Sequence, residues 1–111
     1  MESGNIVKVD ELKFDDTKLI PVIVQDLTTR QVLMLAYANK EAIKKTLETG
    51  FAHFWSRTRK RLWLKGETSG NRLKVDRISV DCDGDTLIYW SNPLGPTCHT
   101  GRQSCFFREL K

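Results

Sequence analysis

The sequence predicts a β-rich α+β domain with one main helix. A chain of 111 residues is long enough for one hydrophobic core but leaves too little for a second. Most apolar residues fall in short β-branched or aromatic runs separated by turn residues, as in strands. One segment shows helical spacing between capping residues. We expect an N-terminal arm at 1–14 and the folded domain at 15–111.

The folded part begins with a predicted hairpin. Residues 19–25 form a β-branched run whose proline stands near its start, where a strand tolerates one. Residues 26–30 supply the polar turn, and residues 32–37 are again apolar. The length of both apolar runs predicts two largely buried strands.

A helix is predicted over residues 40–49. Its apolar residues recur at helical spacing, and lysine and glutamate occupy the other faces. Asn39 is a favourable N-cap and Gly50 stands where a C-cap glycine belongs.

The rest of the chain returns to short strands and loops. Alternating or continuous apolar runs predict strands at 51–56, 61–65, 73–80 and 87–90, and a short closing strand at 105–107. Glycine, proline, serine and asparagine predict loops at 66–71 and 92–101.

Composition bounds the class of protein. The N-terminus lacks a basic segment followed by an apolar stretch, and no apolar run is long enough to span a bilayer. We therefore expect a cytoplasmic protein. Three cysteines, an odd number, cannot all enter internal disulfides, and a reducing compartment keeps thiols free. The cysteines need another role.

An acidic cluster follows the strand predicted at 73–80. Residues two apart in an extended chain share a face, so Asp81, Asp83 and Asp85 point one way and Cys82 the other. Three carboxylates on one face repel unless a cation neutralises them, and oxygen ligands suit Mg²⁺. The alternative is a water-exposed acidic turn without a metal.

The other two cysteines, Cys98 and Cys105, flank a loop that contains His99. Three thiolates on zinc leave one tetrahedral position for water, as in catalytic zinc sites. We predict that Cys82, Cys98 and Cys105 bind zinc, and that His99 stays free as a general base. Burial of the cysteines as core residues, or closure of the zinc shell by His99, remain alternatives.

Cys82 sets a geometric condition on this zinc site. Its side chain faces away from the neighbouring aspartates, which are also expected near the substrate. A zinc ion held between two chains meets the condition, with Cys82 from one chain and the Cys98, Cys105 pair from the other. A small domain that gains stability from a partner fits this arrangement.

A basic segment with two tryptophans precedes the acidic cluster. Arginines bind phosphates through paired donors, and tryptophan faces stack on bases. We predict that Arg57, Arg59 and Lys65 bind phosphate of a nucleotide or a nucleic-acid strand. Trp55 and Trp63 alternatively serve as core residues of a hairpin with a basic turn.

Four motifs in this order resemble the phosphoribosyl-AMP cyclohydrolase family, which acts in the third step of histidine biosynthesis. The motifs are FWSRTR at 54–59, WLKGETSGN at 63–71, DCDGD at 81–85 and GPTCHTGRQSCF at 95–106. The resemblance runs from about Leu19 to Phe107. Minor departures are Thr58, where serine is common, and Ala38, where methionine is common.

The resemblance implies hydrolysis of the N1–C6 bond in the adenine ring of N1-(5-phosphoribosyl)-AMP, which gives a formimino-carboxamide ribonucleotide. It also implies an intertwined homodimer with one zinc per subunit, shared between Cys82 of one subunit and Cys98 and Cys105 of the other. Asp81, Asp83 and Asp85 are implied as Mg²⁺ ligands. Many relatives carry a second, pyrophosphohydrolase domain after the last cysteine. Since Lys111 is the last residue, only the cyclohydrolase activity is expected.

Two other functions fit parts of the sequence. A zinc-stabilised nucleic-acid-binding module would use the basic segment and tryptophans, with the cysteines and His99 as a closed structural site. A metal-free interaction domain would bury its cysteines. Zinc content, and whether chelation removes activity or folding, distinguishes these alternatives from the enzyme.

Overall fold

Within residues 6–111, six strands and one α-helix follow one another in the order that the sequence predicts, and the seventh strand expected at 105–107 is not formed. The computed structural model describes residues 6–111. Its elements are a short 3₁₀-helix η1 (Val9–Glu11), β1 (Ile20–Asp26), β2 (Val32–Ala38), α1 (Lys40–Thr49), β3 (His53–Ser56), β4 (Arg61–Leu64), β5 (Leu73–Val80) and β6 (Leu87–Pro93). The expected β-rich α+β class with one main helix is confirmed.

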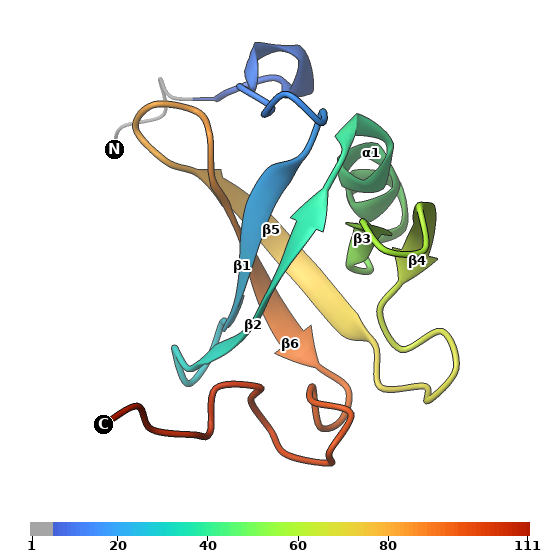
Figure 1. Cartoon of the computed structure of the whole chain (residues 1–111), viewed down its shortest axis with the longest axis vertical. Helices are drawn as coiled ribbons and strands as arrows, with labels where there is room; N and C mark the ends of the chain where they lie inside the picture. Colours follow the sequence, from blue (N-terminus) through green and yellow to red (C-terminus); the bar gives the residue numbers. More distant parts are fainter. Residues whose placement is uncertain (1–5) are drawn as a thin grey trace.

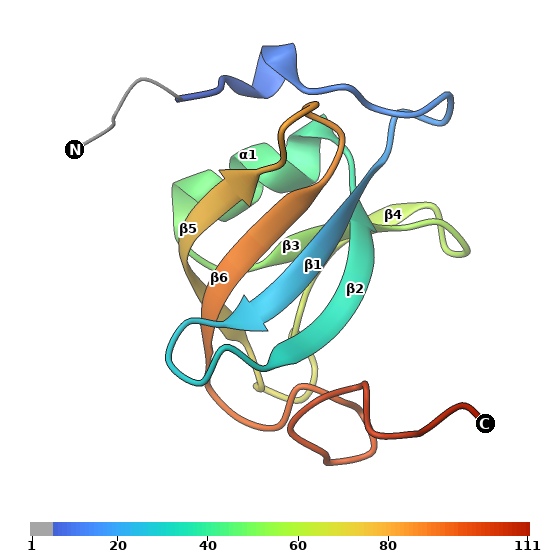
Figure 2. The ribbon, with the colours of Figure 1, turned by 90° about the vertical axis from the view of Figure 1, so that its left-hand side faces the viewer.

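The strands form two sheets. The larger sheet has the order β2-β1-β6-β5, and β3 and β4 form a separate pair. The β1–β2 and β5–β6 pairs are antiparallel, whereas β1 and β6 are parallel. The helix and the β3–β4 pair lie on one face of the larger sheet (Figure 1). Figure 2 looks onto its opposite face, which no described helix or strand covers.

The core lies between the larger sheet and the layer formed by α1 and β3. Burial alternates along β1, where Ile20, Val22 and Val24 point inward, as expected for a strand with one covered face. Phe54 of β3 reaches the middle of this core. Its ring centroid lies 5.2 Å from that of Trp63 and 5.5 Å from that of Tyr89, which are favourable separations for aromatic pairs.

A buried polar network links α1 to both sheets. The Thr46 hydroxyl accepts a hydrogen bond from the His53 amide at 2.9 Å. The Tyr89 hydroxyl donates to the His53 carbonyl at 3.4 Å and lies 3.4 Å from Thr46 Oγ1. Burial raises the pKa of Tyr89 to about 12. Tyr89 is therefore a core residue whose hydroxyl is satisfied inside the protein.

The predicted helix caps are both confirmed. Asn39 Oδ1 accepts a hydrogen bond from the Ala42 amide at 2.9 Å, and Gly50 adopts a left-handed conformation. The Gly50 amide donates to the Thr46 carbonyl at 2.9 Å. These local contacts explain why the helix begins and ends where the sequence indicates.

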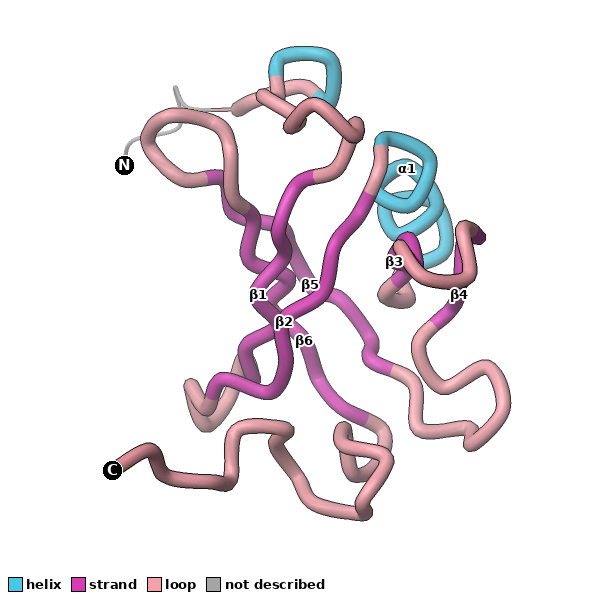
Figure 3. Tube along the Cα trace, in the orientation of Figure 1, coloured by secondary structure: helices cyan, strands magenta, loops and turns pink. Residues whose placement is uncertain are grey.

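The closing strand predicted at 105–107 is wrong, and Figure 3 shows this segment as loop. The Cys105 amide donates to the Leu33 carbonyl of β2 at 2.8 Å. The Phe106 amide donates to the Ser104 hydroxyl at 2.9 Å, a local contact within the loop. One backbone bond does not make a ladder. The β6 strand also extends to Pro93, beyond the predicted end at residue 90.

The β5–β6 pair separates two loops that matter for function. The turn at 81–86 lies at one end of β6, beside the N-terminal segment, whose Lys13 amide donates to the Gly84 carbonyl at 2.8 Å. The loop that follows Pro93 lies at the other end, and both views agree on this placement (Figures 1 and 2). In residues 6–111, no helix has the length and apolar character needed to cross a membrane.

Candidate active site

The loop after β6 holds Cys98 in a tight turn. The Cys98 amide donates to the Arg102 carbonyl at 3.0 Å, and the Gly101 amide donates back to the Cys98 carbonyl at 2.9 Å. Gly101 has a φ of +91°, a conformation that favours glycine. The Thr100 hydroxyl donates to Cys98 Sγ at 3.1 Å. Cys98 is consequently fixed by its neighbours and is only 7% exposed.

The structure brings Cys98 and Cys105 together. Hydrogen bonds from Thr100 lower the pKa of Cys98, and the Cys105 thiol adds to this effect. Partial desolvation raises the pKa of Cys105, as does the neighbouring Cys98 thiol. The positive charge of Lys65 favours the thiolate form at both positions. The pair thus combines a thiol whose pKa is lowered with a second thiol beside it.

Cys82 lies at the opposite end of β6 from this pair. It is exposed in the β5–β6 turn. The seven residues of β6 separate the two ends by roughly 20 Å at about 3.3 Å per residue. Two sulfurs on one zinc lie within about 4.6 Å of each other, twice the Zn–S bond length. Within one chain, the fold therefore unites two of the three predicted zinc ligands and leaves out Cys82.

The three predicted magnesium ligands do lie together. Oxygens of Asp81, Asp83 and Asp85 lie within 4.8 Å of one another, and all three residues are exposed. Partial desolvation opposes ionisation of Asp81, but hydrogen bonds from the Asp85 and Thr86 amides leave its pKa lowered. The adjacent Asp83 and Asp81 carboxyls raise the pKa of Asp85. This donor set suits a hard cation, although exposed acidic turns also occur without one.

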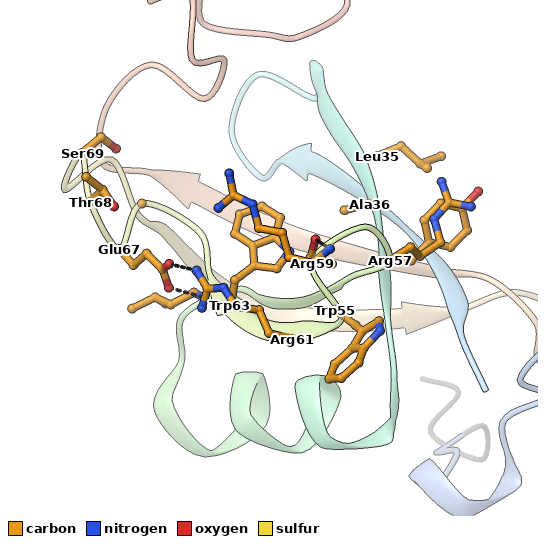
Figure 4. Close-up of a pocket in the computed structure, with 14 residues that line it drawn as sticks. Leu35, Ala36, Trp55, Arg57, Arg59, Arg61, Trp63, Glu67, Thr68 and Ser69 are labelled. Atoms are coloured by element: carbon orange, nitrogen blue, oxygen red, sulfur yellow. Dashed lines mark hydrogen bonds and ion pairs between the residues drawn. The ribbon is translucent and has the colours of Figure 1, made fainter. Parts of the chain in front are cut away.

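A groove of about 550 Å³ lies between β2 and the β3–β4 pair (Figure 4). Its lining combines aromatic and basic side chains, among them Tyr37, Trp55, Arg57, Arg59, Arg61, Trp63 and Glu67. The Arg57 guanidinium lies over the Tyr37 ring at 4.1 Å, a favourable cation–π contact. On another side, Arg61 is paired with Glu67. Arg57 and Arg59 therefore face a groove large enough for a small-molecule ligand.

Lys65, the third predicted phosphate ligand, is placed differently. Its Nζ donates to the Thr97 carbonyl at 2.6 Å, beside the cysteine loop, and it does not line the groove. His99 is exposed and follows Cys98 in the same turn. The basic residues of the predicted site thus divide between the groove and the cysteine loop.

Sequence reasoning missed several residues that line the groove. Arg61 and Glu67 form its ion pair, and this pair together with a hydrogen bond from the Leu64 amide lowers the pKa of Glu67. Tyr37 belongs to β2, for which the sequence predicted a buried strand and no role in a binding site. Glu67 belongs to a quoted motif, but its contact with Arg61 depends on how the chain turns after β4. Trp63 packs on Phe54, as the core alternative predicts, and it also lines the groove.

This arrangement is suited to an anionic aromatic ligand and to a thiolate-bound metal. Guanidinium groups bind phosphate through paired donors, and the aromatic faces accept a planar ring. Paired thiols favour a soft or borderline ion such as zinc, whereas the aspartates favour a hard one.

Comparisons with known proteins find one family along most of the chain. Residues 34–107 match the family model described as phosphoribosyl-AMP cyclohydrolase. A phosphoribosyl-AMP cyclohydrolase of Archaeoglobus fulgidus is 62% identical over 101 residues, covering 91% of this chain and 94% of the relative. One from Methanospirillum hungatei is 58% identical, covering 89% and 76%. A histidine biosynthesis bifunctional protein of Aquifex aeolicus is 58% identical, and the match covers 91% of this chain but 50% of that relative.

Proposed function

The chain belongs to the phosphoribosyl-AMP cyclohydrolase family, and from this premise we propose that it hydrolyses the N1–C6 bond in the adenine ring of N1-(5-phosphoribosyl)-AMP. The observation that carries the proposal is the adjacent Cys98 and Cys105 pair in a fold that also forms a basic, aromatic groove. The product is the phosphoribosyl-formimino-carboxamide ribonucleotide. The family is one of enzymes of histidine biosynthesis.

The donor set fits zinc if two chains cooperate. Cys98 and Cys105 supply two ligands, and Cys82 of a second copy supplies the third, because Cys82 of the same chain lies at the far end of β6. These three thiolates would hold zinc, which would supply Lewis-acid activation of a water molecule. We propose that His99, which is exposed beside Cys98, takes the proton of the attacking water as general base.

The same pairing of chains places the carboxylates. Asp81, Asp83 and Asp85 share the turn that carries Cys82. If Cys82 of one chain binds the same zinc as the cysteine pair of the other chain, the aspartates of its turn lie beside that zinc site. We propose that the three aspartates would hold Mg²⁺ there, which would offset the negative charge of a substrate phosphate.

The groove binds the nucleotide in this proposal. The substrate carries two phosphates, and Arg57 and Arg59 supply guanidinium groups in the groove. Trp63 offers an aromatic face, while Glu67 is held in place by Arg61. Burial of an aromatic ring against such faces and pairing of phosphates with guanidiniums supply orientation as well as affinity.

A homodimer is supported by the uncovered face of the larger sheet. The strand register puts a set of apolar side chains on this face, namely Pro21, Ile23, Leu35, Tyr37, Ile88 and Trp90. Leu35 is 47% exposed. The same register adds the polar Gln25, Arg77 and Ser79 to this face. A sheet face that is rich in apolar side chains and carries a few polar ones is characteristic of an interface with another chain.

The test combines metal content with turnover. We expect about one zinc per chain in the purified protein, as for a site with one full set of ligands per subunit. Ring opening changes the ultraviolet absorbance of the adenine chromophore, which reports turnover directly. Cys98→Ser and Cys105→Ser should lose both zinc and activity, whereas Ser69→Ala, an exposed change in the groove wall, should keep its zinc.

Two results would count against the proposal. Normal turnover in Cys98→Ser would exclude zinc held by this pair. Loss of folding on chelation, in a protein that never opens the ring, would favour the structural zinc alternative.

A further inference from the structure

The end of β4 directs Lys65 toward the cysteine loop. The Lys65 amide donates to the Ala52 carbonyl at 3.0 Å, which fixes its backbone to the core. Its Nζ then donates to the Thr97 carbonyl at 2.6 Å. Thr97 directly precedes Cys98 and is 1% exposed. The ammonium group therefore ends on the buried backbone next to a proposed zinc ligand.

Two further contacts join the same pair of loops. The Leu94 amide donates to the Arg72 carbonyl at 2.9 Å. The Asn71 side chain lies so close to Gly95 that a Cβ at Gly95 would stand 2.2 Å from Asn71 Oδ1. The segment 65–72 thus supports the start of the cysteine loop at three points, and Lys65 is the point nearest Cys98.

The charge of Lys65 matters as well as its hydrogen bond. Three thiolates on Zn²⁺ give the site a net negative charge, and a cation held nearby offsets it. A hydrogen bond from an ammonium to a carbonyl is also stronger than one from a neutral donor. If the ammonium turned toward a phosphate in the groove, the buried Thr97 carbonyl would lose this partner, which is unfavourable.

We infer that Lys65 is a positioning residue of the metal site: it holds the backbone of Thr97 and Cys98 in the geometry that binds the metal, and it does not bind substrate phosphate. This role replaces the phosphate role expected from the sequence. The inference rests on the zinc site of the proposed function, and it concerns a supporting contact outside the ligands themselves.

Zinc affinity, measured by competition with a chromogenic chelator, tests the inference. Loss of groups that support metal ligands typically weakens metal binding by about 10- to 100-fold. We expect a loss in this range for Lys65→Met, which keeps the aliphatic stem and removes the ammonium. Lys65→Arg, which keeps charge and donors, should recover most of the affinity. Lys60→Met is the matched control, because Lys60 is exposed in the β3–β4 turn, and its affinity should equal that of the unmodified protein.

A second readout needs neither metal nor substrate. In the metal-free protein, amide hydrogen exchange in the peptide 95–105 should be faster in Lys65→Met than in the unmodified protein or in Lys65→Arg. If Lys65→Met does not fold, Lys65→Gln, a neutral donor, takes its place, with an intermediate zinc affinity expected.

The outcomes separate this inference from the proposed function. Absence of zinc binding by the unmodified protein would contradict the proposed function, and the exchange comparison would still test the anchoring role. Unchanged zinc affinity and unchanged exchange in Lys65→Met would overturn the inference. A raised KM with both unchanged would do the same, because it would return Lys65 to the phosphate.

Discussion

Replacement of Gly66 by alanine gives a quantitative test of how the loop between β4 and β5 is closed. Gly66 has a φ of +83°. An added Cβ would stand 2.5 Å from the carbonyl carbon of Asn71, 2.6 Å from its oxygen and 2.7 Å from the Arg72 nitrogen. These are backbone atoms, so no side-chain rotation relieves the overlap.

The expected loss of stability has two parts. A left-handed conformation costs an L-residue about 1–2 kcal/mol relative to its preferred region. Overpacking against backbone adds about 1–3 kcal/mol, so Gly66→Ala should lose about 2–5 kcal/mol. Gly70 in the same loop has a φ of +82° but no atom within 4 Å of an added Cβ. Gly70→Ala should therefore lose only the stability that the left-handed conformation costs, about 1–2 kcal/mol.

Urea unfolding of both variants, at the same metal content as the unmodified protein, measures the difference. Because the added Cβ overlaps backbone atoms only at Gly66, we expect Gly66→Ala to be at least about 1 kcal/mol less stable than Gly70→Ala. Equal free energies of unfolding would refute the reasoning, since they would mean that the close approach of Gly66 to Asn71 contributes nothing.

Three further predictions concern the core, the helix and the acidic turn. Folded Tyr89 keeps its proton up to about pH 12, whereas an unfolded tyrosine loses it near pH 10. The folded state then binds more protons, so stability should fall by up to about 3 kcal/mol as pH rises through this window. Urea unfolding of Tyr89→Phe should lack this part of the decline. Asn39→Ala removes the N-cap bond to Ala42 and should cost about 1 kcal/mol in thermal or urea unfolding. Asp83→Asn should raise the Mg²⁺ concentration for half-maximal turnover by at least about tenfold, while Asp76→Asn, exposed on β5, should not; equal shifts in both would argue against a Mg²⁺ site in the turn.

Elements whose signals are local could be predicted from the sequence. The helix is bounded by Asn39 and Gly50, each of which acts on backbone groups within four residues. The alternation of buried and half-buried side chains along β1 likewise follows from the residues of that strand alone. Pairing between distant strands carries no such signal, and the parallel contact of β1 with β6 follows from how the whole core packs. The strand predicted at 105–107 does not form: its backbone contact with β2 is the one hydrogen bond from the Cys105 amide to the Leu33 carbonyl.

The candidate site shows the same division. The motif around Cys98 and Cys105 predicted their proximity, because a short loop connects them. The position of Lys65 depends on a contact with Thr97, 32 residues away, and its sequence neighbours suggested a phosphate ligand instead. The separation of Cys82 from the pair follows from the length of β6. Residues 81–85 form a turn, so the strand alternation assumed for them does not hold there.

The most direct test of the shared zinc site is subunit complementation between Cys82→Ser and Cys98→Ser. Each variant alone should be inactive, because every site in its homodimer lacks one ligand. In a mixed dimer, the Cys82→Ser chain supplies the intact Cys98 and Cys105 pair and the Cys98→Ser chain supplies Cys82, so one site of two is complete. Random exchange of equal amounts makes half of the dimers mixed and should restore about a quarter of the original activity per site. Exchange confirmed by mass spectrometry without any recovered turnover would contradict a zinc site shared between chains.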